Sequence, residues 1–245
     1  MIYVCIPSHD EGPTVGLVLW KTRQVFSDTG REYQLLVVDD ASTDRTAETL
    51  EPYAKVLPLT ILRHKKREGY AASIEALLQL ALERSDRPRR DCAVMMQADF
   101  SHLPQFIPEL VKRIDSGADL VVGEATLEGA PSRGYLMLRR WAPALLGTGA
   151  RVPGLRDVVS GFMAVRLSCL RLAFKDAPEG LFHSEGWAAN AELIRRLATH
   201  ARRIEAVPVV ERLNLRQRPS RVAPWDQAKA LWSARRALRV MGVAR

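Results

Sequence analysis

The sequence predicts an α/β protein built on a mostly parallel sheet flanked by helices. Short apolar runs of strand length alternate with segments of helical periodicity, and turn-forming residues separate them. Hydrophobic residues make up 47% of the 245 positions, which is enough for the core of one large domain. An alternating order of strands and helices predicts parallel pairing, because each helix returns the chain to the same end of the sheet.

The first half of the chain shows this alternation most clearly. The expected strands span residues 2–6, 34–39, 57–63, 93–98 and 120–123, and the expected helices span residues 15–26, 46–53, 71–82 and 104–114. Ser42, Thr43 and Asp44 precede the second helix and carry oxygens that can cap its first turn. Parallel strands end at one edge of the sheet, and ligands bind at that edge in folds of this class.

The second half is less regular. We expect a loop and a basic helical stretch at 135–146, a strand at 158–165, a helix at 185–198, a strand at 204–210, a basic loop at 212–221 and a terminal helix at 226–240. The terminal helix has amphipathic spacing at Leu231, Trp232, Ala234, Arg235 and Leu238. It either lies on an anionic membrane or packs against the domain. The predicted division is a main domain at 1–222 and this basic amphipathic helix at 223–245.

Charge and cysteine content limit the partners and the compartment. The net charge of +8 and the pI near 9.7 predict an anionic partner, such as a nucleotide, a lipid phosphate or a membrane surface. Nucleic acid is disfavoured, because no basic stretch is interleaved with aromatic residues. Cys5, Cys92 and Cys169 are odd in number and far apart, as is typical of buried free thiols in a reducing compartment. With no leader and no apolar run of about 20 residues, we expect a cytoplasmic protein whose membrane contact is peripheral, at the inner face.

Carboxylates follow two of the expected strands. Asp39 and Asp40 close the strand at 34–39, and Asp99 closes the strand at 93–98. These groups should converge if both strands end at the same edge of a parallel sheet. A carboxylate, diphosphate oxygens and water together form a common site for Mg²⁺ or Mn²⁺. Taken singly, each segment is equally compatible with a turn or a helix cap.

Four motifs, in this order, resemble the family 2 glycosyltransferases of the GT-A fold, especially the branch of dolichol-phosphate mannose synthase and other polyprenyl-phosphate glycosyltransferases. Residues 6–11 (IPSHDE) resemble its P-x-Y-N-E opening, and residues 37–44 (VVDDASTD) resemble its V-D-D-x-S-x-D segment. Residues 96–104 (MQADFSHLP) are similar to M-D-A-D-L-S-H-x-P, and residues 157–162 (DVVSGF) to D-x-x-S-G-F. The resemblance implies that residues 1–222 form a GT-A catalytic domain.

The resemblance also implies an activity: inverting transfer of a sugar from a nucleotide-diphosphate sugar to a polyprenyl phosphate. The alternatives are transfer to a saccharide hydroxyl and a degenerate, non-catalytic protein that binds nucleotide sugars. A phosphate acceptor is already negatively charged at neutral pH and needs no strong base. A hydroxyl acceptor would need one, for which Asp157 and Glu185 are the candidates.

The resemblance implies a set of site residues, partly from the matched motifs and partly from the regions that in this family lie along the nucleotide and the acceptor phosphate. The residues expected along the nucleotide are Pro7, Asp10, Glu11, Asp39, Asp40, Gly69, Gln97 and Ala98, with Asp40 on the base. A weakly bound Mg²⁺ or Mn²⁺ is expected on Asp99 and Ser101. The expected catalytic residues are Asp99, Asp157 and Arg139. The residues expected to bind the acceptor or its phosphate are Arg133, Arg140, Ser160, Gly161, Arg216 and Arg221.

The chain departs from the family pattern at three places. His9 stands where the family has Tyr, and Gln97 stands where the metal motif has its first Asp. Glu124 and Ala125 stand where the lipid-phosphate branch carries Ser or Thr followed by Arg. Losing a carboxylate predicts weaker metal binding, and losing a cation predicts that arginines elsewhere bind the acceptor phosphate.

Overall fold

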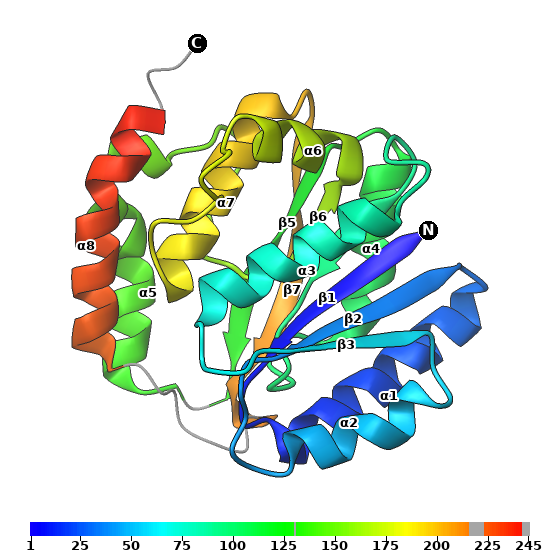
Figure 1. Cartoon of the computed structure of the whole chain (residues 1–245). Coiled ribbons are helices and arrows are strands. Elements are labelled where there is room, and N and C mark those ends of the chain that lie inside the picture. Colours follow the sequence, from blue (N-terminus) through cyan, green and yellow to red (C-terminus); the bar gives the residue numbers. More distant parts are fainter. Residues whose placement is uncertain (130, 216–222, 242–245) are drawn as a thin grey trace.

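The computed structural model describes residues 1–129, 131–215 and 223–241. In this part of the chain a seven-stranded sheet forms the centre, with the strand order β3-β2-β1-β4-β6-β5-β7 (Figure 1). The strands are β1 (Ile2–Ser8), β2 (Tyr33–Asp39), β3 (Leu59–Arg63), β4 (Cys92–Met95), β5 (Leu120–Glu128), β6 (Met163–Arg166) and β7 (Ile204–Arg212). All pairs are parallel except those that β6 forms with β4 and β5, so the predicted mostly parallel sheet is confirmed.

Helices cover both faces of the sheet (Figure 1). One face packs against α1 (Gly12–Thr29), α2 (Thr46–Ala54) and α4 (Ile107–Asp115), and the other packs against α3 (Tyr70–Arg84), α6 (Leu167–Lys175) and α7 (Gly186–His200). The alternation of side chains along β1 explains the two layers: Val4 and Ile6 belong to the first core and Tyr3 and Cys5 to the second.

Two further helices form a third apolar cluster at the side of α7. They are α5 (Arg133–Leu146) and α8 (Pro224–Met241). Leu231, Ala234 and Leu238 of α8 are buried in this cluster, so this face of the helix packs against the domain. Trp232 does not share this face, since it is 59% exposed.

Several boundaries differ from those expected. Strand β4 ends at Met95, and residues 96–98 belong to the following loop. The expected strand at 158–165 begins only at 163, because Val158 and Val159 are buried against the third apolar cluster and not in the sheet. Helix α6 was not expected. Apolar runs that pack a loop have the same composition as buried strands, which explains the differences at 96–98 and 158–162.

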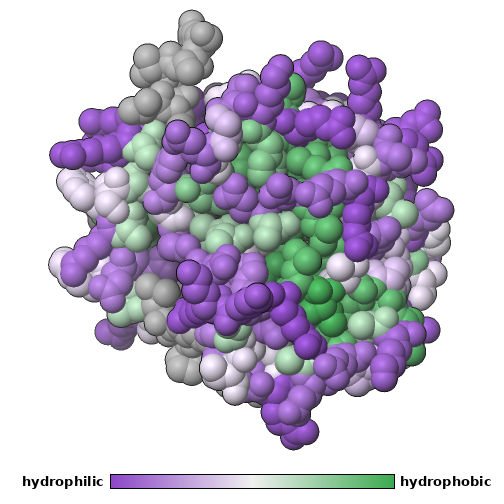
Figure 2. All heavy atoms as spheres, viewed as in Figure 1, coloured by the Kyte–Doolittle hydropathy of each residue, from purple (hydrophilic) through white to green (hydrophobic). Residues whose placement is uncertain are grey.

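The remaining short elements complete the description. They are the 3₁₀ turns η1 (Pro104–Phe106), η2 (Thr148–Ala150) and η3 (Leu213–Leu215). The expected basic loop is therefore strand at Arg212 and helical turn at 213–215, and its remainder lies outside the described residues. Figure 2 shows a hydrophilic rim and hydrophobic residues over the area that β1, β2 and β3 occupy in Figure 1, in keeping with the half-buried edge strand β3. Within the described ranges, no helix combines the length and apolar character needed to cross a bilayer.

Candidate active site

The loops that follow β1, β2 and β4 share an unusual backbone feature. Each contains one non-glycine residue with positive φ: Asp10 at 48°, Ala41 at 53° and Phe100 at 61°. Such residues are uncommon outside turns and store strain, which clusters at functional sites. Because β1, β2 and β4 are parallel neighbours, the three strained loops lie at one edge of the sheet.

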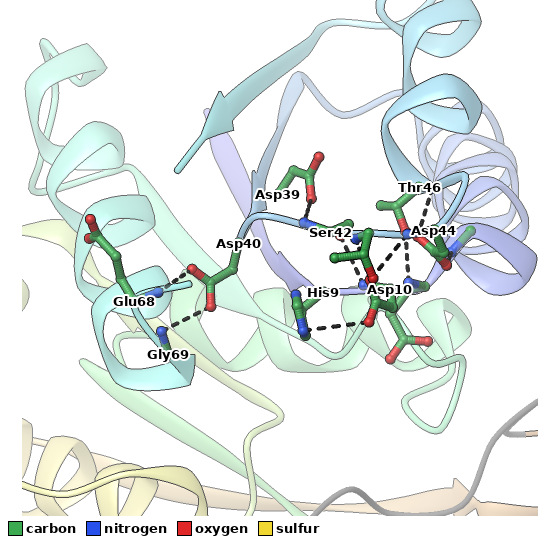
Figure 3. Close-up of polar contacts among 12 residues, drawn as sticks. His9, Asp10, Asp39, Asp40, Ser42, Asp44, Thr46, Glu68 and Gly69 are labelled. Carbon is green, nitrogen blue, oxygen red and sulfur yellow. Dashed lines mark hydrogen bonds and ion pairs between the residues drawn. The ribbon is translucent and has the colours of Figure 1, made fainter. Parts of the chain in front are cut away.

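Asp10 joins the loop after β1 to the loop after β2 (Figure 3). Its Oδ1 accepts hydrogen bonds from the amides of Thr43 (2.6 Å) and Asp44 (3.3 Å), and its own amide donates to Ser42 Oγ (2.8 Å). Partial burial raises the pKa of Asp10, but these amides and nearby His9 more than offset it, so the pKa lies below its ordinary value. Asp10 thus fixes the shape of both loops.

Asp40 joins the loop after β2 to the loop after β3 (Figure 3). Its Oδ1 accepts from the Glu68 amide (2.7 Å) and from His64 Nδ1 (2.8 Å), and its Oδ2 accepts from the Gly69 amide (2.9 Å). Burial raises the pKa of Asp40, and the three hydrogen bonds lower it further than burial raises it. Both carboxylate oxygens of Asp40 thus accept hydrogen bonds from the protein. Asp39 accepts one such bond, from the amide of Ser42 to its Oδ1 at 3.1 Å.

The expected nucleotide residues Pro7, Glu11 and Ala98 are buried below this edge. The Glu11 amide donates to Thr46 Oγ1 at 2.8 Å, at the start of α2. Gly69 has a φ of 102°, and a Cβ there would lie 2.6 Å from Glu185 Oε1. Only glycine fits this position, so the sequence prediction that residue 69 allows close approach has a physical basis in the structure.

Glu185 occupies the space above that glycine for a structural reason. Its Oε2 accepts from the amide of Ala71 at 3.1 Å, in the first turn of α3. A carboxylate in this place satisfies an amide that has no partner within the helix. Its candidacy as a general base stays a prediction.

Asp99 and Ser101 lie together, as the metal motif implies. Asp99 Oδ1 accepts from the Ser101 amide (3.0 Å) and from Ser101 Oγ (2.5 Å). The carbonyl of Ser101 in turn accepts from the amide of Arg212 at the end of β7 (3.0 Å), which anchors this loop to the sheet. Among the described residues, no three His, Cys, Asp or Glu side chains gather to hold a metal. The donor set fits an ion that takes its other ligands from a diphosphate and water.

Gln97 belongs to a hydrogen-bond chain. Its Nε2 donates to Tyr70 Oη (3.2 Å), Tyr70 Oη donates to Asn190 Oδ1 (2.8 Å), and Asn190 Nδ2 donates to the carbonyl of Val159 (3.0 Å). The direction of every bond follows from the last one, because a carbonyl can only accept. Position 97 must therefore supply a donor, which a carboxylate does not. A Cβ at Gly161 would lie 3.0 Å from both Gln97 Nε2 and Tyr70 Oη, so the hydrogen-bonded side chains of Gln97 and Tyr70 lie directly against this glycine.

Arg139 and Asp157 are brought into contact, as two members of one ionic cluster. Arg139 bonds to Asp157 Oδ2 (2.5 Å) and to Glu211 Oε2 (2.8 Å), and its guanidinium lies 5.7 Å from the ring centre of Trp187. Burial lowers the pKa of Arg139, but the two carboxylates outweigh it and raise the pKa. Sequence reasoning missed Glu211, because its partner Arg139 lies 72 positions away along the chain.

The other expected acceptor residues lie on two elements. Ser160 is buried and its Oγ accepts from the amide of Phe162 at 3.2 Å, within the loop that contains Gly161. Arg133 and Arg140 are exposed on α5. Arg216 and Arg221 lie outside the described residues.

A strand-end site of this kind on a seven-stranded α/β sheet fits the GT-A class of proteins. Residues 3–171 match the profile described as "Glycosyl transferase family 2", and the chain belongs to this family. It is 30% identical to the undecaprenyl-phosphate mannosyltransferase of Micrococcus luteus over 212 residues, which cover 85% of this chain and 82% of the relative. It is 27% identical to the dolichol-phosphate mannosyltransferase of Pyrococcus furiosus over 174 residues, covering 67% of this chain.

The chain spans about half of that archaeal relative, 46% of its length. Among solved structures, the chain resembles glucosyl-3-phosphoglycerate synthase of Mycobacterium tuberculosis in complex with Mn²⁺, UDP and phosphoglyceric acid. The TM-score is 0.66 and the identity 19%, with 100% of this chain and 80% of that chain covered. These comparisons confirm the predicted family and the GT-A fold. The assignments of individual residues stay predictions.

Proposed function

We propose that the protein transfers a sugar from a nucleotide-diphosphate sugar to a polyprenyl phosphate, with inversion at the sugar carbon. The observation that carries this proposal is the convergence of the loops after β1, β2, β3 and β4, with Asp99 at the edge of the sheet. The names of the two mannosyltransferase relatives support the class of donor and acceptor.

On the donor side, Asp39 is better placed than Asp40 to contact the nucleoside. All three hydrogen bonds of Asp40 go to residues 64–69, so its role is to hold that loop against β2. Asp99 would hold a divalent ion together with the donor's diphosphate. When bound, such an ion neutralises charge on the departing nucleoside diphosphate. Ser101 orients the Asp99 carboxylate through its amide and its hydroxyl.

On the acceptor side, the loop at 157–162 approaches the same edge. Gly161 lies under the Gln97–Tyr70–Asn190 chain, which fixes the loop relative to the end of β4. The acceptor phosphate attacks the sugar carbon with its own negatively charged oxygen, so this reaction needs no side chain as a base. The pairing of Asp157 with Arg139 suits a positioning role.

The test of this function uses purified protein and a panel of nucleotide sugars. We expect one donor to raise the melting temperature and to release its nucleoside diphosphate faster when Mn²⁺ and undecaprenyl phosphate are present. Asp99→Asn keeps an acceptor for Ser101 but removes the charge, and should lower the rate by at least about tenfold. Glu109→Gln, a change at a partly exposed position on α4, is the matched control and should leave the rate unchanged. Equal rates for Asp99→Asn and Glu109→Gln would refute the metal role.

We also propose that α5 and α8 hold the protein at an anionic membrane surface, where a polyprenyl phosphate resides. Both helices expose large apolar side chains beside cations: Leu136, Met137 and Trp141 on α5 (44%, 62% and 58% exposed), and Trp225 and Trp232 on α8 (72% and 59% exposed). Exposed tryptophan next to basic residues is typical of interfacial helices.

Vesicle sedimentation checks this surface. Vesicles containing phosphatidylglycerol should bind the protein more strongly than vesicles of phosphatidylcholine, and the paired change of Trp141 and Trp232 to Ser should reduce binding several-fold. Trp20 is 43% exposed on α1, away from these helices, so Trp20→Ser is the matched control. The surface is wrongly assigned if the control reduces binding as much as the paired change.

A further inference from the structure

A groove runs between the second half of α5 and the segment at 150–158. It consists of three adjoining hollows of about 360, 480 and 360 Å³, and Pro143 lines all three. Arg156 and Val158 line both the first and the second, and Arg151 lines both the second and the third. The three hollows therefore adjoin one another, and together we call them the groove.

The two ends of the groove differ in character. The inner hollow reaches Arg139 and Asp157, so it opens at the acceptor side of the candidate site. The outer hollow reaches Arg140 and Trp141, on the exposed side of α5. The groove thus connects the candidate site with the surface that we assign to the membrane.

The middle of the groove is apolar. Its lining includes Pro143, Val152, Leu155 and Val158, of which Val152 and Val158 are almost fully buried, at 3% and 5% exposure. A volume of about 480 Å³ falls within the range of small-molecule sites, roughly 300–1,000 Å³. A hollow of this size and lining suits the first units of a hydrocarbon chain.

Cations lie where this apolar middle meets the inner and outer hollows. Arg151 and Arg156 are exposed, and neither guanidinium forms an ion pair with any residue that the structure describes. Arg139 differs, because two carboxylates already occupy its guanidinium. The amide of Arg156 donates to Glu124 Oε1 at 2.6 Å, which fixes the backbone of this residue beside the inner hollow.

We propose that this groove binds the acceptor: Arg156 binds the phosphate, and Pro143, Val152, Leu155 and Val158 contact the first isoprenoid units. The charge of Arg156 complements a phosphate monoester, and the guanidinium can donate two parallel hydrogen bonds to it. The rest of the isoprenoid then leaves the groove past Arg151 and Trp141 toward the membrane surface. This inference rests on the proposed function for the class of acceptor, and it places the phosphate on a different arginine from those predicted by the sequence.

Farnesyl phosphate, a short and soluble isoprenoid phosphate, is the probe for this groove. We expect calorimetry to show that it binds the intact protein at least about tenfold more tightly than inorganic phosphate or farnesol does, because only it uses both halves of the groove. Arg156→Gln should weaken binding of farnesyl phosphate at least about tenfold and leave farnesol unaffected. Leu155→Asn should weaken both isoprenoids.

Arg171→Gln, an exposed change on α6, is the matched control and should not alter binding. Equal affinities for Arg156→Gln and Arg171→Gln would overturn the groove assignment. Sugar transfer, measured on the same samples, separates the groove assignment from the proposed function. If farnesyl phosphate binds normally to Arg156→Gln while sugar transfer continues, the groove is wrong and the proposed function stands. If the wild type binds no farnesyl phosphate and transfers no sugar, both fail.

Discussion

Tyr70→Phe tests the hydrogen-bond chain that fixes the loop around Gly161. The change removes one oxygen and keeps the ring in place. Asn190 Oδ1 then loses its donor and Gln97 Nε2 loses its acceptor. Burial raises the pKa of Tyr70, so the hydroxyl is protonated and donates in the wild type.

The magnitude follows from the burial of the atoms left behind. Asn190 is 4% exposed, so its carbonyl oxygen cannot recover a partner from solvent easily. A buried acceptor without a donor costs about 1–3 kcal/mol. Gln97 is only half-buried, so its amide can turn to water and adds little. We therefore expect Tyr70→Phe to lower the free energy of unfolding by about 1–3 kcal/mol.

Urea denaturation measures this loss, with Tyr53→Phe as the matched control. Tyr53 is half-buried on α2, and its hydroxyl forms no hydrogen bond with a residue that the structure describes, so its change should cost less than about 0.5 kcal/mol. In the transfer assay, Tyr70→Phe should raise KM for the acceptor more than for the donor, because the chain ends at the carbonyl of Val159 beside the acceptor loop. Indistinguishable free energies of unfolding for Tyr70→Phe and Tyr53→Phe would refute the stabilising role of the hydrogen bonds that Tyr70 forms with Gln97 and Asn190.

Three further outcomes follow. Asp40→Asn should destabilise the protein at neutral pH, and the difference from wild type should shrink as the pH falls below about 4. The pKa of Asp40 is lowered in the folded protein, so its charged carboxylate stabilises the fold at pH values above the ordinary pKa of 3.8, and this stabilisation is lost as the pH falls through the folded-state pKa. Denaturation across a pH series checks this. Gly161→Ala should impair sugar transfer while nucleotide binding by calorimetry stays unchanged, since a Cβ would press on the Gln97 amide at 3.0 Å. Arg139→Met should cost about 3–5 kcal/mol in urea denaturation, because it leaves the buried Glu211 without its cation.

The sequence predicted the central features of the fold and the positions of the motifs. Periodicity predicted the parallel strands, because β1 and β2 are buried on both faces and read as continuous apolar runs. The edge that carries Asp39, Asp40 and Asp99 followed from the rule that parallel strands end together. The three strained positions in the adjoining loops could not be predicted, because backbone angles depend on contacts between loops.

The roles of individual side chains depended on partners distant in the chain. Gln97 reads as a lost metal ligand in the sequence, yet in the structure its amide supplies a donor that Tyr70 requires. The sequence places Arg139 among the expected catalytic residues but does not show that it pairs with Asp157 and Glu211. Each of these pairings joins separate elements, so no local pattern reveals them.

The most direct test of the proposed function is the product itself. Purified protein is incubated with the donor that gives the largest thermal shift, Mn²⁺ and undecaprenyl phosphate, and the lipid extract is analysed by mass spectrometry. We predict a glycosyl phosphate ester of the lipid, present with wild type and strongly reduced with Asp99→Asn. Transfer of the sugar to a saccharide hydroxyl, with the lipid phosphate left unmodified, would contradict the proposal.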